Sequence, residues 1–273
     1  MNAFLNSCRD AGITPVENSL DCDAVVIWSI LWNGRMSKNK WTYEHYRSIG
    51  KPVVVIDAGA LEREVTWKIA VNNITSEGYY GHTDNLDWDR PKKLGVSLQK
   101  NKLNDNILIA AQHKKSLQWE GMPILEDWTV DLIHKIRKYS DRHIVVRYHP
   151  RCPYFIPTQR FKMLIMNKVI SNCVLETPMQ IESTYDAFDI DYNYHAVVNH
   201  CSGPGINAVI AGSNVIVDKK SLAYPMSVKL KQIENPPRKR NKDRWLVEIC
   251  HTEYRVDEIA EGLWLTRLKN ALE

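Results

Sequence analysis

A turn between two apolar runs has the composition of an anion-binding loop. Residues 202–205 (SGPG) follow the run 196–198 (AVV), and an alanine-rich segment leads from them to the run 214–217 (NVIV). Glycine lets backbone N–H groups approach an oxygen closely, and a helix that begins here directs its N-terminal N–H groups at an anion. Such a turn alone is more often a structural connection. If the turn is a ligand site, we expect these residues to contact a diphosphate: Ser202, Gly203, Pro204, Gly205 and Asn207.

Two earlier strand ends add polar side chains. Arg147 and His149 alternate with valines in 143–150 (HIVVRYHP), and Gln112 closes the run 106–112 (NILIAAQ). In open α/β sheets, ligands lie outside the carboxyl ends of the strands, and guanidinium groups are strong donors to phosphate oxygens. The coincidence with the glycine turn favours a diphosphate site. The side chains predicted to join it are Gln112, His113, Arg147, His149 and Arg151.

The first half of the chain ends its own predicted strands in polar residues. Asn33 and Arg35 follow the run 23–32 (DAVVIWSILW), whereas Asp57, Glu62 and Arg63 follow the run 51–56. By the same rule, these side chains are expected at the ligand edge of a first sheet.

Other phosphate, metal and redox motifs are absent from the sequence. The turn does not match G-x-G-x-x-G, because Ala208 holds the third glycine position, and no P-loop sequence occurs. The six cysteines have no C-x-x-C spacing, which indicates reduced structural thiols. Three D-x-D triplets begin at Asp21, Asp87 and Asp189, and among 32 acidic residues such triplets arise by chance. A divalent metal is therefore compatible with the sequence but is not required by it.

The order of the elements predicts an α/β protein of two Rossmann-like domains. A strand at 23–32, a helix at 39–50 and a strand at 51–59 form a βαβ unit, which implies a parallel sheet. The polar stretch 83–105 is the expected connection. Strands at 106–112 and 143–150 then flank a helix at 123–140 with an apolar face of Ile124, Trp128, Leu132, Ile136 and Tyr139.

Weaker patterns complete the second half and the tail. A short basic helix, a strand near 173–176, a helical piece around 179–188 and the strand, turn, helix and strand of the opening turn follow in order. The tail has helical periodicity and no strand signal. We therefore expect domains at 1–100 and 101–245, with C-terminal helices at 246–273 that pack back toward the first domain.

Charge and hydropathy indicate a soluble protein with two basic segments. Hydrophobic residues make up 44% of the chain, charged residues 25%, and the net charge is +4. No leader pattern or run of about 20 apolar residues occurs, so we expect no transmembrane segment and a cytoplasmic location. Residues 90–93 (RPKK) and 236–244 (PPRKRNKDR) concentrate positive charge. Such segments either contact phosphate groups or are solvated loops.

Several of these motifs together resemble a known family. Residues 200–217 (HCSGPGINAVIAGSNVIV) are similar to the nucleotide-sugar site of GT-B glycosyltransferases, whose usual shape is S-[ST/G]-x-G-x-E-A-x-x-x-G-x-P-V-I. The segment 147–151 (RYHPR) resembles the R-x-H-P strand end of surface-polysaccharide and related phage-encoded transferases. The tail 244–268 (RWLVEICHTEYRVDEIAEGLWLTRL) and residues 52–74 look like phage-type members. The resemblance covers most of the chain.

The resemblance implies a fold and a division of labour. Two domains would face an interdomain cleft, the second holding a nucleotide sugar, expected to be UDP-linked, and the first holding the acceptor near Asn33, Arg35, Glu62 and Arg63. Asp57 would be the general base that takes the proton of the acceptor hydroxyl, unless the reaction retains configuration or Asp57 only caps its turn or pairs with Arg63. No cofactor is required. The sequence departs from the pattern at Asn207, where many members have a glutamate for the donor ribose, and at Asn214, where they have a proline.

The acceptor suggested by the phage-like tail is a hydroxymethylated base in viral DNA, within the cytoplasm of a bacteriophage-infected host. DNA modification of this kind requires DNA binding, and cationic phosphate contacts are then expected from Arg238, Lys239 and Arg240. Two alternatives remain: transfer to capsule or surface polysaccharide, and a sugar-nucleotide-binding or epimerase-like protein. The sequence gives no oligomeric state.

Overall fold

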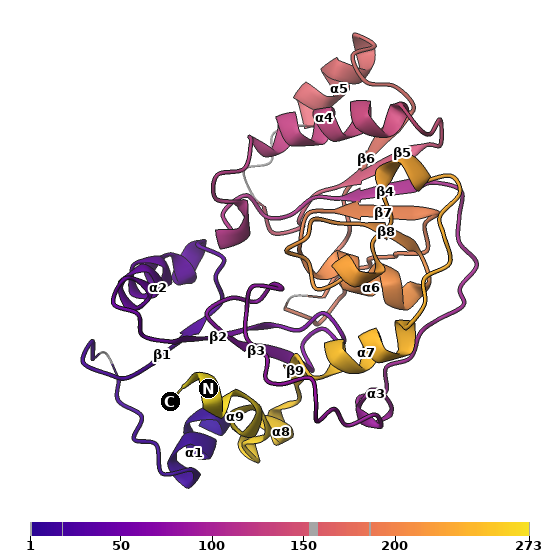
Figure 1. The fold of residues 1–273 in the computed structure, drawn as a ribbon. Helices are drawn as coiled ribbons and strands as arrows, with labels where there is room; N and C mark the ends of the chain where they lie inside the picture. Colours follow the sequence, from indigo (N-terminus) through magenta and orange to yellow (C-terminus); the bar gives the residue numbers. More distant parts are fainter. Residues whose placement is uncertain (1, 18, 153–157, 186, 273) are drawn as a thin grey trace. The chain divides into compact units, whose positions relative to one another are not determined.

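A computed structural model describes every residue except 1, 18, 153–157, 186 and 273. The chain divides into two compact units (Figure 1). Unit 1 consists of residues 1–96 and 244–273, and unit 2 of residues 97–243. Each contains its own β-sheet with helices against it, so the predicted α/β class is confirmed.

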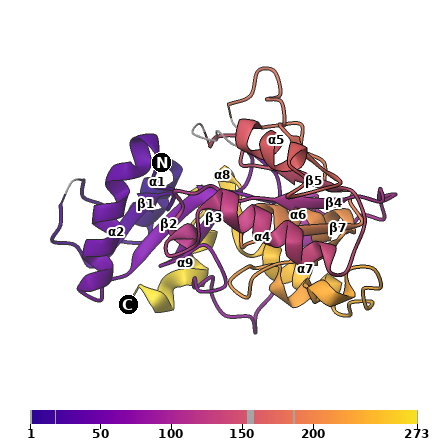
Figure 2. The same cartoon turned by 90° about the horizontal axis from the view of Figure 1, so that it is seen from above.

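The sheet of unit 1 is mixed. Strand β1 (Val25–Trp28) is parallel to β2 (Val53–Ala58), and α2 (Asn39–Ser48) connects them, which confirms the predicted βαβ unit. In Figures 1 and 2, α2 runs alongside these two strands. Two further strands, β3 (Trp67–Val71) and β9 (Glu253–Tyr254), add antiparallel pairs in the order β1-β2-β3-β9.

The C-terminal tail contributes both helix and strand to unit 1. The expectation of a tail without a strand was wrong at β9, whose two residues are held by pairing with Trp67 and Lys68 rather than by any local pattern. The ends of the chain pack together: Phe4 stacks on Trp264 with ring centroids 4.1 Å apart. Besides α2, this unit contains the helices α1 (Asn2–Asp10), α3 (Arg90–Lys93), α8 (Val256–Ala260) and α9 (Leu263–Leu268), with 3-10 turns η1 (Gly34–Lys38) and η5 (Lys269–Ala271). Helix α7 (Lys242–Cys250) begins at the last residues of unit 2.

Unit 2 has a fully parallel sheet in a doubly wound order. Its strands lie in the order β6-β5-β4-β7-β8. From β4 the chain moves outward to β5 and β6, returns to pair β7 with β4, and then adds β8, so the direction of winding reverses between β4 and β7. Ligands of doubly wound sheets bind at this switch point. The strands are β4 (Ile107–Ala110), β5 (Ile144–Arg147), β6 (Cys173–Glu176), β7 (Ala196–Asn199) and β8 (Asn214–Ile216).

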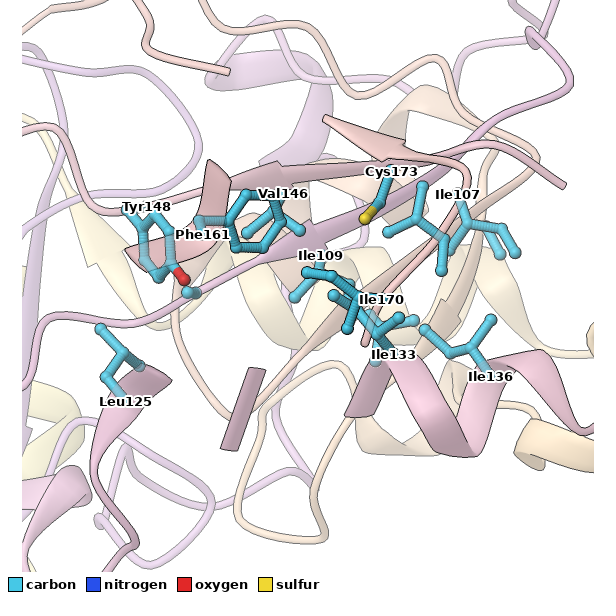
Figure 3. Packing of buried hydrophobic residues seen from close by; sticks show 14 of the residues in the cluster. Ile107, Ile109, Leu125, Ile133, Ile136, Val146, Tyr148, Phe161, Ile170 and Cys173 are labelled. Carbon is cyan, nitrogen blue, oxygen red and sulfur yellow. The ribbon is translucent and has the colours of Figure 1, made fainter. Parts of the chain in front are cut away.

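One face of this sheet is covered by α4 (Leu125–Arg137) and α5 (Thr158–Met166). Figure 3 shows Ile133 and Ile136 of α4 in one cluster with Ile107 and Ile109 of β4. The buried stripe of α4 starts at Leu125, one residue later than predicted, and Ile124 is 64% exposed. Ile124 caps the helix in an extended conformation (ψ 134°), so its side chain does not continue the helical face.

The other connections are α6 (Gly203–Ala211) and irregular segments. The predicted helical piece around 179–188 was wrong, because Gln180 and Phe188 form an isolated antiparallel bridge instead. Asp189 accepts the Met179 N–H and the Gln180 side chain donates to Thr184 O, and such local bonds compete with helix formation. Unit 2 also has 3-10 turns η2 (Leu117–Trp119), η3 (Tyr224–Met226) and η4 (Leu230–Gln232).

Candidate functional site

A buried asparagine joins the two strand ends of the switch point. Asn199, the last residue of β7, is 2% exposed. Its amide donates to Ala110 O (2.6 Å) and to Ser202 Oγ (3.0 Å), and its Oδ1 accepts the Ser202 N–H (2.9 Å). These bonds hold Ser202 as the N-cap of α6 beside the end of β4. The sequence prediction missed Asn199, although its place directly after the AVV run and three residues before Ser202 is typical of side-chain-to-backbone turns.

A second amide connects the loop after β4 to the same turn. The side chain of Gln112 is 4% exposed and donates to Ser116 Oγ (2.8 Å), while its Oε1 accepts the Cys201 N–H (3.3 Å). Both ends of the amide bind within the protein, so Gln112 positions the turn, and its direct contact with the donor stays a prediction.

The glycine turn forms the start of α6, and the N-terminus of this helix points at the switch point. Helix α6 starts at Gly203, and Pro204 lies in its first turn, where its missing N–H costs no helical bond. Gly205 has a packing reason, because a Cβ there would lie 3.1 Å from Val217 Cγ1. Asn207 is half-buried, and its side chain has no hydrogen bond to another described residue.

His113 and His149 link the loops after β4 and β5. His113 Nδ1 accepts the Lys115 N–H (3.1 Å), so Nε2 carries the proton and donates to Arg151 O (3.2 Å). The ring lies edge-on to His149, 5.1 Å between centroids. Burial lowers the pKa of His113, and the bond to Arg151 O partly opposes this. His113 is therefore neutral at pH 7 and serves as a fixed dipole.

His200 was not among the predicted site residues. It is 8% exposed beside the turn, its Nε2 lies 3.2 Å from Gln118 O, and its ring meets Trp119 edge-on. Burial lowers the pKa of His200, against the opposing charge of Asp218.

Arg147 is engaged by other residues of unit 2, and its predicted contact with a diphosphate stays a prediction. Its guanidinium is buried and pairs with Glu176 (2.8 Å), the residue directly beside it on β6. It also donates to Asp191 O (2.8 Å) and to Tyr194 Oη (3.2 Å). A buried guanidinium needs such partners, and they come from the end of β6 and from the segment between β6 and β7.

Arg151 is also engaged by that segment. Its guanidinium lies 4.4 Å from the centroid of the Tyr185 ring and donates to Tyr185 O. To contact the donor directly, as predicted, the Arg151 side chain would have to break its interactions with Tyr185. Lys114, half-buried between His113 and Lys115, is a cation of the same edge that has no recorded side-chain partner among the described residues.

The matching edge of unit 1 places Asp57 beside a strained serine. Ser29 follows β1 at φ 63° and is 4% exposed. Its hydroxyl donates to Asp57 Oδ2 (3.1 Å), and the Ala58 N–H donates to Oδ1 (2.7 Å). Burial raises the pKa of Asp57, and these two bonds with the charges of Lys68 and Arg63 partly oppose the rise. A positive φ in a non-glycine residue is uncommon and concentrates at functional sites.

A fully buried glutamate organises the loop that follows Asp57. Glu253 of β9 is 0% exposed; it accepts the N–H groups of Ala60 (2.7 Å) and Leu61 (3.0 Å) and pairs with Lys68 at 3.7 Å. Tyr80 lies near this cluster, where burial and the charges of Glu253 and Asp57 raise its pKa well above the ordinary value. Its hydroxyl is buried without a hydrogen-bond partner among the described residues.

The acceptor-side residues predicted in unit 1 lie on two loops. Asn33 and Arg35 belong to the turn into η1, where Asn33 is half-buried and Arg35 exposed. Glu62 and Arg63 are exposed on the loop between β2 and β3. They follow the carboxyl ends of β1 and β2, and Asp57 is the last residue but one of β2.

The two basic segments differ in structure. Arg90 is buried and bound to Glu258 (2.6 Å) and to the carbonyls of Cys250 and Glu253, so residues 90–93 are not a free basic loop. Arg238 and Lys239 instead line a pocket with Asn214, the first residue of β8. That is the amino edge of the sheet, opposite the glycine turn.

The described residues form neither a cluster of metal ligands nor a helix that could span a membrane. Within the described part of the chain, no group of three or more His, Cys, Asp or Glu is arranged to hold a metal ion. None of the helices that the structure describes is both long and apolar enough to cross a membrane.

Comparison with known proteins adds distant likenesses. No family model and no curated protein match the sequence. Among solved structures, the chain is similar to Thermosulfurimonas dismutans KpsC, beta Kdo 2,7 transferase, with 11% identity, a TM-score of 0.41 and coverage of 96% of this chain and 87% of that chain. It is also similar to Thermosulfurimonas dismutans KpsC, beta Kdo 2,4 transferase, with 12% identity, a TM-score of 0.45 and coverage of 89% and 87%. At these TM-scores neither likeness carries an argument on function.

Proposed function

We propose that the protein is a glycosyltransferase that uses a nucleoside-diphosphate sugar. The observation that supports this most is the switch point of unit 2, where Asn199 holds Ser202 and the first turn of α6 beside the end of β4. An anion placed there would meet the positive end of a helix dipole and backbone N–H groups. The resemblance of residues 200–217 to nucleotide-sugar sites supports the same ligand.

The donor contacts follow from which groups remain available. Because Arg147 is paired with Glu176, the charge that develops on a departing diphosphate would be stabilised by the α6 N-terminus, Ser202 and Lys114. Preorganised dipoles of this kind lower the barrier without rearrangement during the reaction. Asn207 would hydrogen-bond a donor hydroxyl with its amide.

The base of the proposed reaction is Asp57. An acceptor hydroxyl must lose its proton as it attacks C1 of the sugar, and a carboxylate whose pKa is raised by burial holds that proton better than an exposed one. Ser29 fixes the orientation of Asp57 by donating to one of its oxygens.

We propose a hydroxymethylated base of DNA as the acceptor, with surface polysaccharide as the alternative. The basic segment 236–244 supports a polyanionic acceptor. Its place at the amino edge of the sheet means that it would hold DNA away from the donor turn instead of beside it. Residues 90–93 lend no support, because Arg90 is internal.

The decisive experiment supplies donor and acceptor together. The full chain is incubated at low salt with radiolabelled UDP-sugars and a hydroxymethylated duplex, with the unmodified duplex and the Asp57→Asn variant as controls. We expect label on the modified duplex only. Label on a polysaccharide primer instead would select the alternative acceptor, and release of a free sugar epimer would select an epimerase. Absence of transfer to every acceptor across a panel of nucleotide sugars would refute the proposed activity.

A further inference from the structure

A small basic pocket lies at the amino edge of the unit 2 sheet. It has a volume of about 240 Å³ and is bordered by Ser213 and Asn214 at the start of β8, and by Val209 in the last turn of α6. The other side is the segment 236–242, which contributes Arg238, Lys239 and Lys242. The pocket is therefore separate from the glycine turn at the carboxyl edge of the same sheet.

The three cations of this pocket are unpaired in the described part of the chain. Neither an ion pair nor a side-chain hydrogen bond is recorded for Arg238, Lys239 or Lys242 with any residue that the structure describes. The neighbouring acid, Glu234, is instead bound to Arg142 at 3.0 Å. Three like charges around one hollow repel each other, and an anion in the hollow removes that repulsion.

The basic segment also stands at the unfavourable end of a helix. Helix α7 begins at Lys242, directly after Arg238, Lys239 and Arg240. Cations near a helix N-terminus oppose the helix dipole, whereas anions there stabilise the helix. Asp243 in the first turn of α7 offsets only part of this positive charge, so the excess of cations before the helix is better explained by a bound anion. Pro236 and Pro237 restrict the approach of the chain and reduce the entropy lost when an anion is bound.

We propose that this pocket binds a phosphate group. At about 240 Å³ it is smaller than the roughly 300 Å³ at which pockets for drug-sized ligands begin, so it suits one oxyanion and not a whole nucleotide. A phosphate group carries one negative charge in a nucleic-acid backbone and about 1.5 to 2 as a monoester at neutral pH, and its acceptor oxygens match the three cationic donors of the pocket. The phosphate belongs either to a free phosphate compound or to a nucleic-acid backbone. The inference does not depend on the proposed transferase activity.

The test is a titration of the full chain with inorganic phosphate in chloride buffer at constant ionic strength. Calorimetry and the midpoint of thermal unfolding are recorded for the wild type and for Lys239→Gln with Lys242→Gln. We expect saturable binding with a rise in the midpoint, and at least about a tenfold loss of affinity in the double variant, because each lost charged donor is typically worth 1.5–3 kcal/mol, or about tenfold and more.

A matched control separates this site from general charge effects. Lys135→Gln with Lys162→Gln removes the same two charges from exposed positions of α4 and α5 on the same unit, and should leave phosphate affinity unchanged. A short DNA duplex is then added as a competitor. If the pocket binds backbone phosphates, the duplex displaces inorganic phosphate. If it binds a free phosphate compound, the duplex does not. Equal phosphate affinity in the pocket and control variants, or no saturable binding to the wild type, overturns the proposal.

Discussion

The carboxyl edges of the two sheets are built from different kinds of polar group. In unit 2, the amides of Asn199 and Gln112 join the ends of β4 and β7 around the start of α6, and His113 joins the loops after β4 and β5. In unit 1, Asp57, Lys68 and Glu253 are ionisable, and the pKa of Asp57 is raised by burial. A neutral hydrogen-bonded network suits the binding of an anion, whereas a carboxyl with a raised pKa suits the exchange of a proton. The contrast supports donor binding in unit 2 and base chemistry in unit 1.

The buried charges of unit 1 also carry a structural role. Gly59 has no room for a side chain, since a Cβ would lie 2.5 Å from Glu253 Oε2. Thr66 Oγ1 donates to the same carboxylate at 2.8 Å. Glu253 and the loop that follows Asp57 lie nearly 200 positions apart along the chain, and these contacts hold them together. Glu253, Gly59 and Thr66 thus shape the loop, whereas Asp57 is the residue proposed to react.

The largest expected effect is on the proposed base. Asp57→Asn should lower the rate of sugar transfer by about 10²–10⁴-fold, the usual contribution of general acid–base catalysis, while the protein stays folded. Transfer is measured with the labelled-donor assay, and folding by thermal unfolding. Asp84→Asn, at an exposed position of the same unit, is the control. Retained turnover in the Asp57 variant would remove this residue as the base.

The next effect tests whether the charged cluster holds unit 1 together. Glu253→Ala leaves Lys68 buried without its partner and two backbone N–H groups unsatisfied, so the free energy of unfolding should fall by about 3–5 kcal/mol. Urea unfolding measures the change. Glu248→Ala, which breaks an exposed pair with Arg244, should cost at most about 1 kcal/mol. Similar losses in both variants would contradict a special role for the buried carboxylate.

A smaller loss is expected at the neutral network of unit 2. Asn199→Ala removes three hydrogen bonds at the switch point and should reduce the free energy of unfolding by about 1–3 kcal/mol. Because Ser202 would lose its anchor, affinity for UDP should fall as well, as calorimetry can show. Asn101→Ala, at an exposed position of unit 2, should change neither quantity appreciably. Unaltered UDP affinity in the Asn199 variant would argue against binding at this edge.

The smallest effect concerns the serine beside Asp57. Transfer should fall as the pH drops through the raised pKa of Asp57, because only the carboxylate accepts a proton. The bond from Ser29 lowers that pKa, so Ser29→Ala should move the acidic limb of the pH–rate profile to higher pH. The rate on the plateau should change by less than about tenfold, as expected for one hydrogen bond. Ser37→Ala, whose hydroxyl binds Gly34 O, should leave the limb in place. A limb at the same pH in both variants would show that Ser29 does not act through Asp57.

Sequence patterns predicted most elements but only part of the site. The runs at 106–112 and 143–150 are buried strands because parallel strands covered on both faces are continuously apolar. The glycine turn was placed correctly at a strand end and helix start. Arg147 looked available, since its partner Glu176 lies 29 residues further along the chain and nothing local indicates the pairing. Glu253 gave no signal at all, because its contacts with 59–66 depend on a strand pair of only two residues.

What the sequence determined by itself is the order of strands and helices and the residues that stand at each strand end, since both follow from local periodicity and turn composition. Only the tertiary structure decided which of those residues are engaged. It paired Arg147 with Glu176, placed Ser29 beside Asp57 and moved residues 236–242 to the edge opposite the glycine turn. Polar side chains bind whatever partner the fold brings within about 3 Å, and such partners come from distant parts of the chain.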